Sequence, residues 1–576
     1  MGSIEIAMTN RYAIGLDFGT NTVRALLVDV ATGDEAATSV FGYPHGTNGV
    51  VTDASDPDLA RHHPADYLEG VTATVRDVLA QAAAERESFS PSHVVGIGVD
   101  TTGSTPLPVD ETGRALAMKD GFRDNPHAMA WLWKDHTGHA EAEAITARAE
   151  EVRPQFLARC GGRYSSEWFW AKIWRCARVA PEVFEQAHTW VEVADWVPAV
   201  LTGHEDPRAM KRGICAAGHK AMFHPDWGGY PDAEFLASLD PSLATVRETL
   251  PDRAFNVSDA AGGLSGEWAD RLGLPAGTSV AVGAFDAHLG AIGSGVAPGV
   301  MVKIIGTSTC DITVSPMDGT DGSLPDIPGL CGIVPESVLP ESYGLEAGQS
   351  AVGDIFNWFV EVVRPGGVDG SHEALTRAAE ALRPGESGLL ALDWHNGNRT
   401  VLVDQRLTGL ILGLTLHSTP AEIYRALIEA TAFGARTIAE RFAEYGVPIE
   451  RVINCGGIAA KNPLVMRIYA DVLNRPMQVS RSNQTCALGA AMAGSVVAGK
   501  ERGGHAGFRE AAEAMTGLGE VEYAPDPDRA AAYDRLFRLY HDLHDAFGVS
   551  GHRSDISHVM KELLDIRDEA RREGSP

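Results

Sequence analysis

The sequence lacks an excess of positive charge. Its 576 residues hold 48 lysines and arginines against 77 aspartates and glutamates, which gives a formal net charge of −29. Nucleic-acid binding needs a concentrated basic face that neutralises phosphates, so we expect no nucleic-acid partner. The same acidity argues against anionic membranes. It does not exclude nucleotides, because Mg²⁺ and backbone amides can bind their phosphates.

The sequence also lacks paired cysteines and long hydrophobic runs. Its seven cysteines are scattered and form no C-x-x-C pair, which is typical of reduced thiols and not of a disulfide framework or a zinc site. The first residues, MGSIEIAMTNR, contain no apolar signal core. The most apolar small-residue stretch, Cys486 to Gly499, is too short to span a bilayer. We therefore expect a cytoplasmic protein without a membrane partner.

What the sequence does contain is one strand–turn–strand pattern, present twice. In Tyr12–Asp29 an apolar run meets the turn D-F-G-T-N-T and is followed by a second, alternating run. Val300–Val314 has the same layout around G-T-S-T. Two copies about half a chain apart indicate an internal duplication.

Helices and strands alternate after each copy. The apolar residues of Tyr67–Ala84 recur on one helical face, and Val94–Val99 has the pattern of a buried strand. In the second half, a long helix near Pro420–Tyr445 begins with a capping box, and a strand follows at Arg451–Cys455. This alternation predicts α/β layers.

The two turns are candidate phosphate-binding loops, because glycine lets backbone amides approach a phosphate and nearby hydroxyls add hydrogen bonds. The residues concerned are Gly19, Thr20, Asn21 and Thr22 in the first turn and Gly306, Thr307 and Ser308 in the second. Asp17 enters the first turn from its strand, where a carboxylate can orient Mg²⁺ through water. The competing interpretation is a pair of ordinary hairpins. Because the pattern is present twice, this interpretation is weaker than that of phosphate-binding loops.

Asp286 is the candidate general base. It follows an apolar strand and opens the small-residue helix of the segment GAFDAHLGAIG, so rigid elements would hold its carboxylate near a reacting hydroxyl. The competing interpretation is a helix N-cap, a common role of aspartate, and the two roles can coexist.

A third candidate segment follows the strand at Arg451–Cys455. Gly456 and Gly457 open a helix and Asn462 follows. Paired glycines at such a place can admit the flat face of an adenine. A plain strand-to-helix turn explains the glycines equally well.

Taken together, these segments resemble the FGGY family of carbohydrate kinases, in the superfamily of actin, hexokinase and the heat-shock ATPases. The two hairpins are similar to the family's phosphate loops, and GAFDAHLGAIG is similar to its catalytic segment. SSEWFWAKIW (165–174) and the run that begins with GLILGL (409–414) are similar to the two family signatures, although Leu427 departs slightly from the second.

The resemblance implies an α/β fold of two duplicated actin-like, ribonuclease H-like lobes around a central cleft. It assigns 11–298 to an N-terminal lobe with the sugar site and catalytic base, and 299–548 to a C-terminal lobe that binds the nucleotide. The charged tail, 549–576, either caps a lobe or is partly mobile. The segment 315–340, rich in Gly, Pro and Asp, is expected to be a loop or a hairpin insertion.

Within the family, several segments are most similar to the branch that phosphorylates L-ribulose, among them NPHAMAWLWKDHT (125–137) and AAGHKAMFHPDWGGYP (216–231). The resemblance implies transfer of the ATP γ-phosphate, with Mg²⁺, to the terminal hydroxyl of this 2-ketopentose, in L-arabinose breakdown. It further implies a metal site at Asp17 and Asp286. The implied sugar site consists of Asp100, Thr101, Thr102, Gly103, Lys220, Asp286 and Glu346.

Several alternatives stay open at this point. The substrate can be another ketopentose, D-ribulose or xylulose. A non-catalytic actin-like protein is a second option, against which Asp286 speaks, and a sugar sensor is a third, although no basic DNA-binding module is visible. Without the resemblance, Lys220 would be taken as a surface lysine and Glu346 as a helix cap. The sequence does not set the oligomeric state, so a homodimer is kept open.

Overall fold

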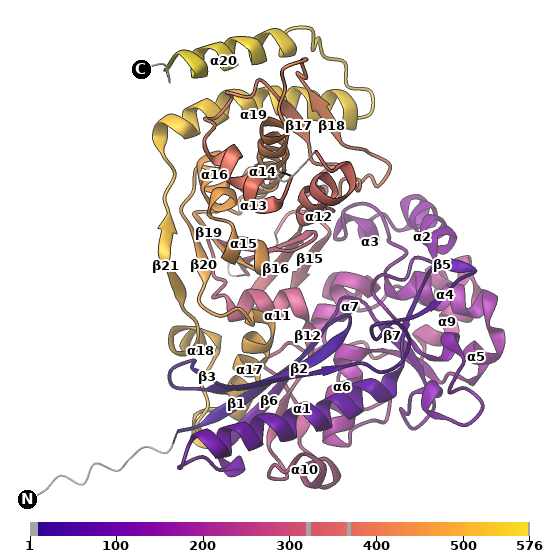
Figure 1. The fold of residues 1–576 in the computed structure, drawn as a ribbon. Coiled ribbons are helices and arrows are strands. Elements are labelled where there is room, and N and C mark those ends of the chain that lie inside the picture. Colours follow the sequence, from indigo (N-terminus) through magenta and orange to yellow (C-terminus); the bar gives the residue numbers. More distant parts are fainter. Residues whose placement is uncertain (1–9, 318–323, 366–369, 574–576) are drawn as a thin grey trace, which may run out of the picture.

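The protein consists of two lobes stacked one above the other, each built on a mixed sheet of seven strands (Figure 1). The computed structural model describes residues 10–317, 324–365 and 370–573. Among these residues, none of the helices combines the length and the apolar character that a membrane crossing requires. All seven cysteines are free thiols, as predicted.

The first sheet has the strand order β10-β11-β6-β1-β2-β3, with β12 paired to β6. Its strands are β1 (Tyr12–Phe18), β2 (Thr22–Asp29), β3 (Glu35–Gly42), β6 (Val94–Thr101), β10 (Ala260–Gly263), β11 (Ser279–Ala281) and β12 (Ala284–Phe285). The predicted hairpin is confirmed, because β1 pairs antiparallel with β2. β6, β11 and β12 then run parallel to β1.

The second sheet has the order β15-β16-β14-β13-β19-β20-β21. Its strands are β13 (Val300–Ile305), β14 (Thr309–Pro316), β15 (Gly332–Pro335), β16 (Ser342–Ala347), β19 (Arg451–Cys455), β20 (Met477–Ser480) and β21 (Leu518–Tyr523). The hairpin β13–β14 is confirmed, and β19 and β20 run parallel to β13. In both sheets the hairpin carries one further antiparallel strand, β3 in the first and β16 in the second, and is extended on its other side by parallel strands, which confirms the predicted duplication.

Part of the predicted insertion at 315–340 is an edge of this sheet. β15 pairs antiparallel with β16, so the hairpin form of the prediction is the closer one. Residues 318–323, in the same segment, lie outside the described part of the chain.

Two helices connect the sheets, α11 (Asp286–Gly293) and α17 (Thr485–Ala498). They pack on each other, and α17 also packs on β1 and β6 of the first sheet. The approach requires glycine, since a Cβ at Gly15, Gly96 or Gly98 would lie 1.7–1.9 Å from a backbone oxygen of α17. A segment from the second half of the sequence thus completes the core of the first lobe, and the limits 11–298 and 299–548 remain a proposal.

The remaining helices cover the sheets. In the first lobe α1 (Pro64–Glu85) packs on β2 and β3, and α6 (Val193–Thr202) packs on β6. The other helices of this lobe are α2 (His139–Val152), α3 (Gln155–Ala158), α4 (Phe169–Val179), α5 (Pro181–Gln186), α7 (Ile214–Ala221), α8 (Ala233–Leu239), α9 (Pro241–Arg247) and α10 (Gly266–Leu272). Its small sheets are formed by β4 (Val51–Asp53), β5 (Asp56–His62) and β8 (Ala130–Trp131), and by β7 (Pro106–Val109) and β9 (Thr189–Glu192).

In the second lobe α14 (Pro420–Glu444) is the longest helix, and its predicted capping box between Thr419 and Glu422 is present. The other helices are α12 (Gly353–Asn357), α13 (His372–Glu380), α15 (Gly457–Lys461), α16 (Pro463–Leu473), α18 (Phe508–Met515), α19 (Pro527–Gly548) and α20 (Val559–Glu573). A two-stranded sheet of β17 (Leu390–Leu392) and β18 (Leu410–Leu412) completes this lobe.

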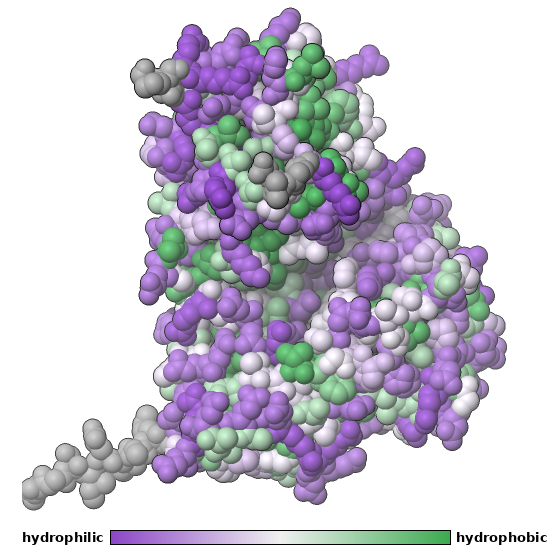
Figure 2. Space-filling model, in the orientation of Figure 1, coloured by the Kyte–Doolittle hydropathy of each residue, from purple (hydrophilic) through white to green (hydrophobic). Residues whose placement is uncertain are grey.

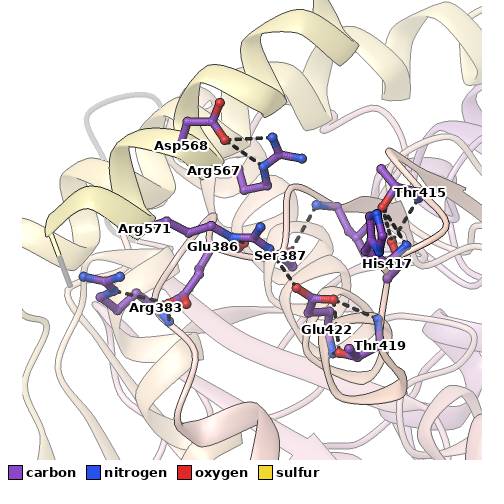
Figure 3. Close-up of polar contacts among 12 residues, drawn as sticks. Arg383, Glu386, Ser387, Thr415, His417, Thr419, Glu422, Arg567, Asp568 and Arg571 are labelled. Carbon is purple, nitrogen blue, oxygen red and sulfur yellow. Dashed lines mark hydrogen bonds and ion pairs between the residues drawn. The ribbon is translucent and has the colours of Figure 1, made fainter. Parts of the chain in front are cut away.

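The charged tail caps the second lobe. Leu563 and Ile566 of α20 are buried in the core of that lobe. Figure 3 shows the polar side of the contact, where Arg571 reaches Glu422 at 3.1 Å and the carbonyl oxygen of Glu386 at 3.2 Å. Of the two options for the tail, capping a lobe is therefore confirmed for residues 559–573.

Candidate active site

Three carboxylates meet at one edge of the first sheet. Asp17 lies near the end of β1, Asp100 near the end of β6, and Asp286 directly after β12. Asp17 is in register with Asp100, which on its other side is in register with Ala284 of β12. Because these strands are parallel, their carboxyl ends meet at the same edge, where open α/β sheets bind ligands.

Burial raises the pKa of all three carboxylates. Asp100 is fully buried, and neither of its carboxylate oxygens has a hydrogen-bond partner among the described residues. Burial, with Asp17 and Asp286 nearby, raises the pKa of Asp100 well above its ordinary value. Burial also raises the pKa of Asp17. Three crowded carboxylates, with no N–H or hydroxyl donor to the oxygens of Asp100 among the described residues, fit a site for a divalent cation, which would stabilise their ionised forms.

Asp286 is half-buried at the start of α11. Phe285 occupies the N-cap position, and Asp286 is the first helical residue, where its Oδ1 accepts the N–H of Ala287 at 2.6 Å. Burial, together with the charges of Asp17 and Glu346, raises the pKa of Asp286 to about 7. A carboxylate with such a pKa is suited to accept a proton near neutral pH.

The two turns use their backbone in the same way. The N–H of Gly19 donates to Thr22 O at 2.9 Å, and the N–H of Gly306 donates to Ser308 O at 3.0 Å, so each glycine closes its own turn. The next two amides of each turn, at positions 20–21 and 307–308, make no hydrogen bond within the described residues. These amides, and not those of the glycines, are the donors that remain for phosphate oxygens.

Hydrogen bonds to neighbouring segments fix the position of both turns. In the first turn Trp133 Nε1 donates to Thr20 Oγ1 at 3.1 Å, and Asn21 Nδ2 donates to Asn48 O at 2.5 Å. In the second turn Thr307 O accepts the N–H groups of Val352 and Asp354 at 2.8 and 3.1 Å. The side chain of Asn21 therefore supports the loop, while the hydroxyl of Thr20 keeps its own proton for a ligand.

A cavity of about 740 Å³ opens next to the second turn. Gly306, Thr307, Gly457 and Asn462, all predicted for the nucleotide, line this cavity. Gly456, at the start of α15, has a φ of +96°, and a Cβ there would lie 2.5 Å from Ile305 O. The volume is within the range of small-molecule sites, and the turn supplies it with free amides at one end.

Lys220 and Glu346 face each other across the cleft. Lys220 lies in the last turn of α7, Glu346 lies on β16, and both are buried. Lys220 Nζ lies 3.0 Å from both carboxylate oxygens of Glu346. Burial opposes both charges, yet the pairing raises the pKa of Lys220 and holds that of Glu346 well below its usual range. The interpretations as a surface lysine and as a helix cap are therefore wrong.

The loop after β6 is folded inward. Thr101 Oγ1 donates to Thr102 O at 3.1 Å, and Thr102 Oγ1 lies 3.1 Å from Thr105 Oγ1. These two hydroxyls are thus engaged within the loop. Gly103 is the part with open space, because a Cβ there would meet no atom within 4 Å. Figure 2 shows the surface hollowed between the two lobes.

Some residues at these sites carry no signal that identified them in the sequence. Gly353, Thr376 and Tyr424 line the cavity from α12, α13 and α14. Of these, Gly353 lies against the second turn, since a Cβ there would lie 2.5 Å from Gly306 O. His219 and His288, beside Lys220 and Asp286, face Glu346 at 3.2 and 3.8 Å.

Comparisons with known proteins agree with this geometry. Residues 12–293 match the N-terminal domain, and residues 301–498 the C-terminal domain, of the FGGY family of carbohydrate kinases. The chain belongs to this family. The two matched domains contain all the predicted site residues, from Asp17 to Asn462.

Relatives and solved structures add detail. A ribulokinase from Geobacillus thermodenitrificans is 43% identical, with 98% of each chain covered. A ribulokinase from Mycolicibacterium smegmatis is 40% identical, over 98% of this chain and 97% of the relative. The structure of xylulose kinase from Rhodospirillum rubrum superposes with a TM-score of 0.73 at 24% identity, over 93% of this chain and 99% of that one. The predicted family is thereby confirmed, as is the actin-like two-lobed fold, and the name of the relatives agrees with the predicted branch.

Proposed function

We propose that the protein transfers the γ-phosphate of ATP to the terminal hydroxyl of L-ribulose, giving L-ribulose 5-phosphate in L-arabinose breakdown. The observation that carries the proposal is the match to relatives named ribulokinase over nearly the whole of both chains. The site supports it, because the carboxylate cluster, the free turn amides and the cavity lie on the two sides of one cleft. The scattered free thiols favour a cytoplasmic location.

These groups share the tasks of the reaction, and Asp286 has two of them. Asp286 accepts the proton of the attacking hydroxyl as the new phosphorus–oxygen bond forms. The amides at 20–21 and 307–308 hold the phosphates, and the cavity beside Gly457 takes the adenine. Asp17 and Asp286 would hold Mg²⁺, which supplies charge neutralisation on the phosphates. Lys220, Glu346 and the loop at 100–103 bind the sugar.

A coupled ADP-release assay tests the substrate. We expect L-ribulose to give the highest kcat/KM among L-ribulose, D-ribulose, xylulose and glycerol. A higher value for D-ribulose or xylulose would move the assignment to another ketopentose kinase. Glycerol as the best substrate would exclude the ketopentose class, and no turnover with any of them would favour a non-catalytic ATP-binding protein.

A further inference from the structure

Behind the Lys220–Glu346 pair lies a cluster of two histidines and a carboxylate that the proposed reaction does not use as a unit. His219 comes from α7, His288 from α11 and Glu346 from β16. All three are buried, and one ligand atom of each lies within 4.8 Å of the other two. His219 Nδ1 is 3.2 Å and His288 Nε2 3.8 Å from the same oxygen, Glu346 Oε2.

The hydrogen bonds of Ser337 favour one tautomer of His219. The hydroxyl of Ser337 has one proton, which it donates to Val334 O at 3.1 Å. When the hydroxyl is used in this way, the contact of 2.9 Å between His219 Nε2 and Ser337 Oγ uses the proton of the imidazole. In a neutral ring this leaves Nδ1 without a proton.

In this tautomer a lone pair on His219 Nδ1 faces Glu346 Oε2 at 3.2 Å, and Nδ1 has no hydrogen-bond partner among the described residues. His288 adds a third group of the same kind. It is only 2% exposed, and neither of its ring nitrogens has a hydrogen-bond partner among the described residues. Facing acceptors repel each other unless a cation lies between them. The arrangement therefore marks a position where a positive charge would be stabilised.

The spacing suits a metal ion of the zinc class. Bond lengths of about 2.0–2.2 Å to nitrogen and oxygen in a tetrahedral site place neighbouring ligand atoms about 3.3 Å apart. The distance of 3.2 Å between His219 Nδ1 and Glu346 Oε2 already matches, while His288 Nε2, at 3.8 Å from the same oxygen, has to move closer for the ion to bind. The bond from His219 Nε2 to Ser337 is also the outer contact that orients a ligating imidazole.

We infer that His219, His288 and Glu346 bind one divalent transition-metal ion, such as Zn²⁺ or Co²⁺, with water as the fourth ligand. The ion is bound by Oε2 of Glu346, which leaves Oε1 for Lys220. This site is separate from the proposed magnesium site at Asp17 and Asp286, because imidazoles favour zinc-class ions and hard carboxylates favour magnesium.

Metal binding has a consequence that rests on the proposed function. If Lys220 and Glu346 bind the sugar, an ion on Glu346 repels the ammonium of Lys220 and withdraws one carboxylate oxygen. Zn²⁺ should therefore raise the KM for L-ribulose more than the KM for ATP. An ion bound by His219, His288 and Glu346 would thus inhibit the kinase by weakening its binding of the sugar.

A second cluster offers similar groups and must be separated in the experiment. His45, His63 and Asp66 also place their ligand atoms within 4.8 Å of one another. There, however, His63 Nδ1 already accepts the N–H of Ala65 at 3.2 Å, and the His45 side chain is 46% exposed. His45→Ala removes this cluster without touching the cleft, which makes it the matched control.

The test is a Co²⁺ titration of the whole protein without substrates, followed by visible absorption and by metal analysis after desalting. We expect one tetrahedral Co²⁺ per chain in the wild type and in His45→Ala. His219→Gln and His288→Gln should each weaken binding by at least about 100-fold, and Ser337→Ala by about 10- to 100-fold, because it only orients His219. Thermal melts of each variant show that it is folded.

Three results would overturn the inference: wild-type affinity weaker than about 1 mM, binding retained in the double variant His219→Gln/His288→Gln, or binding lost in His45→Ala. Since the titration uses no sugar, its result does not depend on the substrate assignment. L-ribulose added afterwards should displace the ion. Retention of Co²⁺ at saturating ribulose would support the metal site while contradicting its overlap with the sugar.

Discussion

The two hairpins of the duplicated fold have the same shape and opposite chemistry. Two residues before the turn glycine, the first copy has Asp17, in register with Asp100 on the next strand. At the same place the second copy has Ile304, in register with Cys455. The first hairpin therefore brings carboxylates to the cleft, while the second brings an apolar surface and leaves only its amides for a ligand.

The second hairpin does hold a charged pair, but inside the lobe. Lys303 Nζ lies 2.9 Å from both carboxylate oxygens of Asp311, and both residues are fully buried. Gln349 adds a further contact to Lys303 at 2.9 Å. Every partner there is satisfied within the protein, whereas the oxygens of Asp100 have none among the described residues. A buried carboxyl group without a donor marks the copy that carries the chemistry, and a buried carboxylate paired with a lysine marks the copy that supports it.

Asp286→Asn, on the side of the cleft that carries the carboxylates, should lower turnover more than the other substitutions. The amide keeps the shape and the contact with Ala287 but cannot accept a proton, so kcat should fall about 100- to 10,000-fold. Both affinities should stay nearly unchanged. Asp240→Asn is the matched control, since Asp240 caps α9 and asparagine caps about as well as aspartate. Turnover of Asp286→Asn near that of the wild type would exclude the base.

Asp17→Asn and Asp311→Asn should separate the two hairpins. Asp17→Asn removes a carboxylate from the cluster, so we expect at least about a tenfold loss of kcat and a higher Mg²⁺ requirement, with little change in Tm. Asp311→Asn leaves Lys303 buried without its partner, which costs about 3–5 kcal/mol of stability, while the folded fraction keeps its turnover. Mg²⁺ titrations and thermal melts measure both, and the reverse pattern would contradict the comparison.

The duplication itself was predictable from the sequence because its signals are local. A turn rich in glycine and threonine between two apolar runs specifies a hairpin over fewer than 20 residues. The capping box of α14 is equally local. The place of α17 was not predictable, because a helix that is apolar all round is expected to be buried but does not indicate its partner. Only the structure shows that Gly15, Gly96 and Gly98 receive it.

The candidate site likewise contains residues that local motifs predict and residues that they do not. Asp17, Asp286 and the turn glycines follow from motifs along the chain, whereas Lys220 and Glu346 came only from family resemblance. Their pairing joins residues 126 positions apart, which no local pattern specifies. The same is true of His219 and His288, since a histidine in a helix has no sequence context that distinguishes a ligand from a core residue.

Lys220→Ala tests the side of the cleft that faces the sugar. Loss of a charged partner from a buried site costs about 1.5–3 kcal/mol, so the KM for L-ribulose should rise by about 10- to 100-fold, with a smaller change for ATP. Lys500→Ala is the control, because Lys500 forms an ion pair with Glu510 in which both side chains are exposed, and such pairs contribute little. An unchanged ribulose KM would place Lys220 outside the site.

Gly306→Val tests the side that faces the nucleotide. The nearest atom to a Cβ there is Ser308 O at 3.8 Å, so the variant should fold normally while its side chain enters the cavity. We expect ADP affinity, measured by calorimetry, to fall by about tenfold or more, with ribulose affinity affected less. Gly42→Val, on β3, is the control, since a Cβ there also meets no atom within 4 Å. Unchanged ADP affinity would contradict the phosphate loop.

The smallest expected effect is a pH dependence that belongs to the first hairpin alone. Asp286 acts as base only when ionised, and its pKa is raised to about 7, so kcat/KM should rise about tenfold from pH 6 to pH 8. The residual activity of Asp286→Asn should lack this rise.

The same raised pKa of Asp286 also predicts how the stability of the fold depends on pH. A carboxyl whose folded pKa exceeds its unfolded value stabilises the fold below the unfolded pKa, and this contribution is lost as pH rises through 7. Asp286→Asn should therefore gain in Tm over the wild type between pH 5 and pH 8. A constant difference in Tm would show that Asp286 titrates normally.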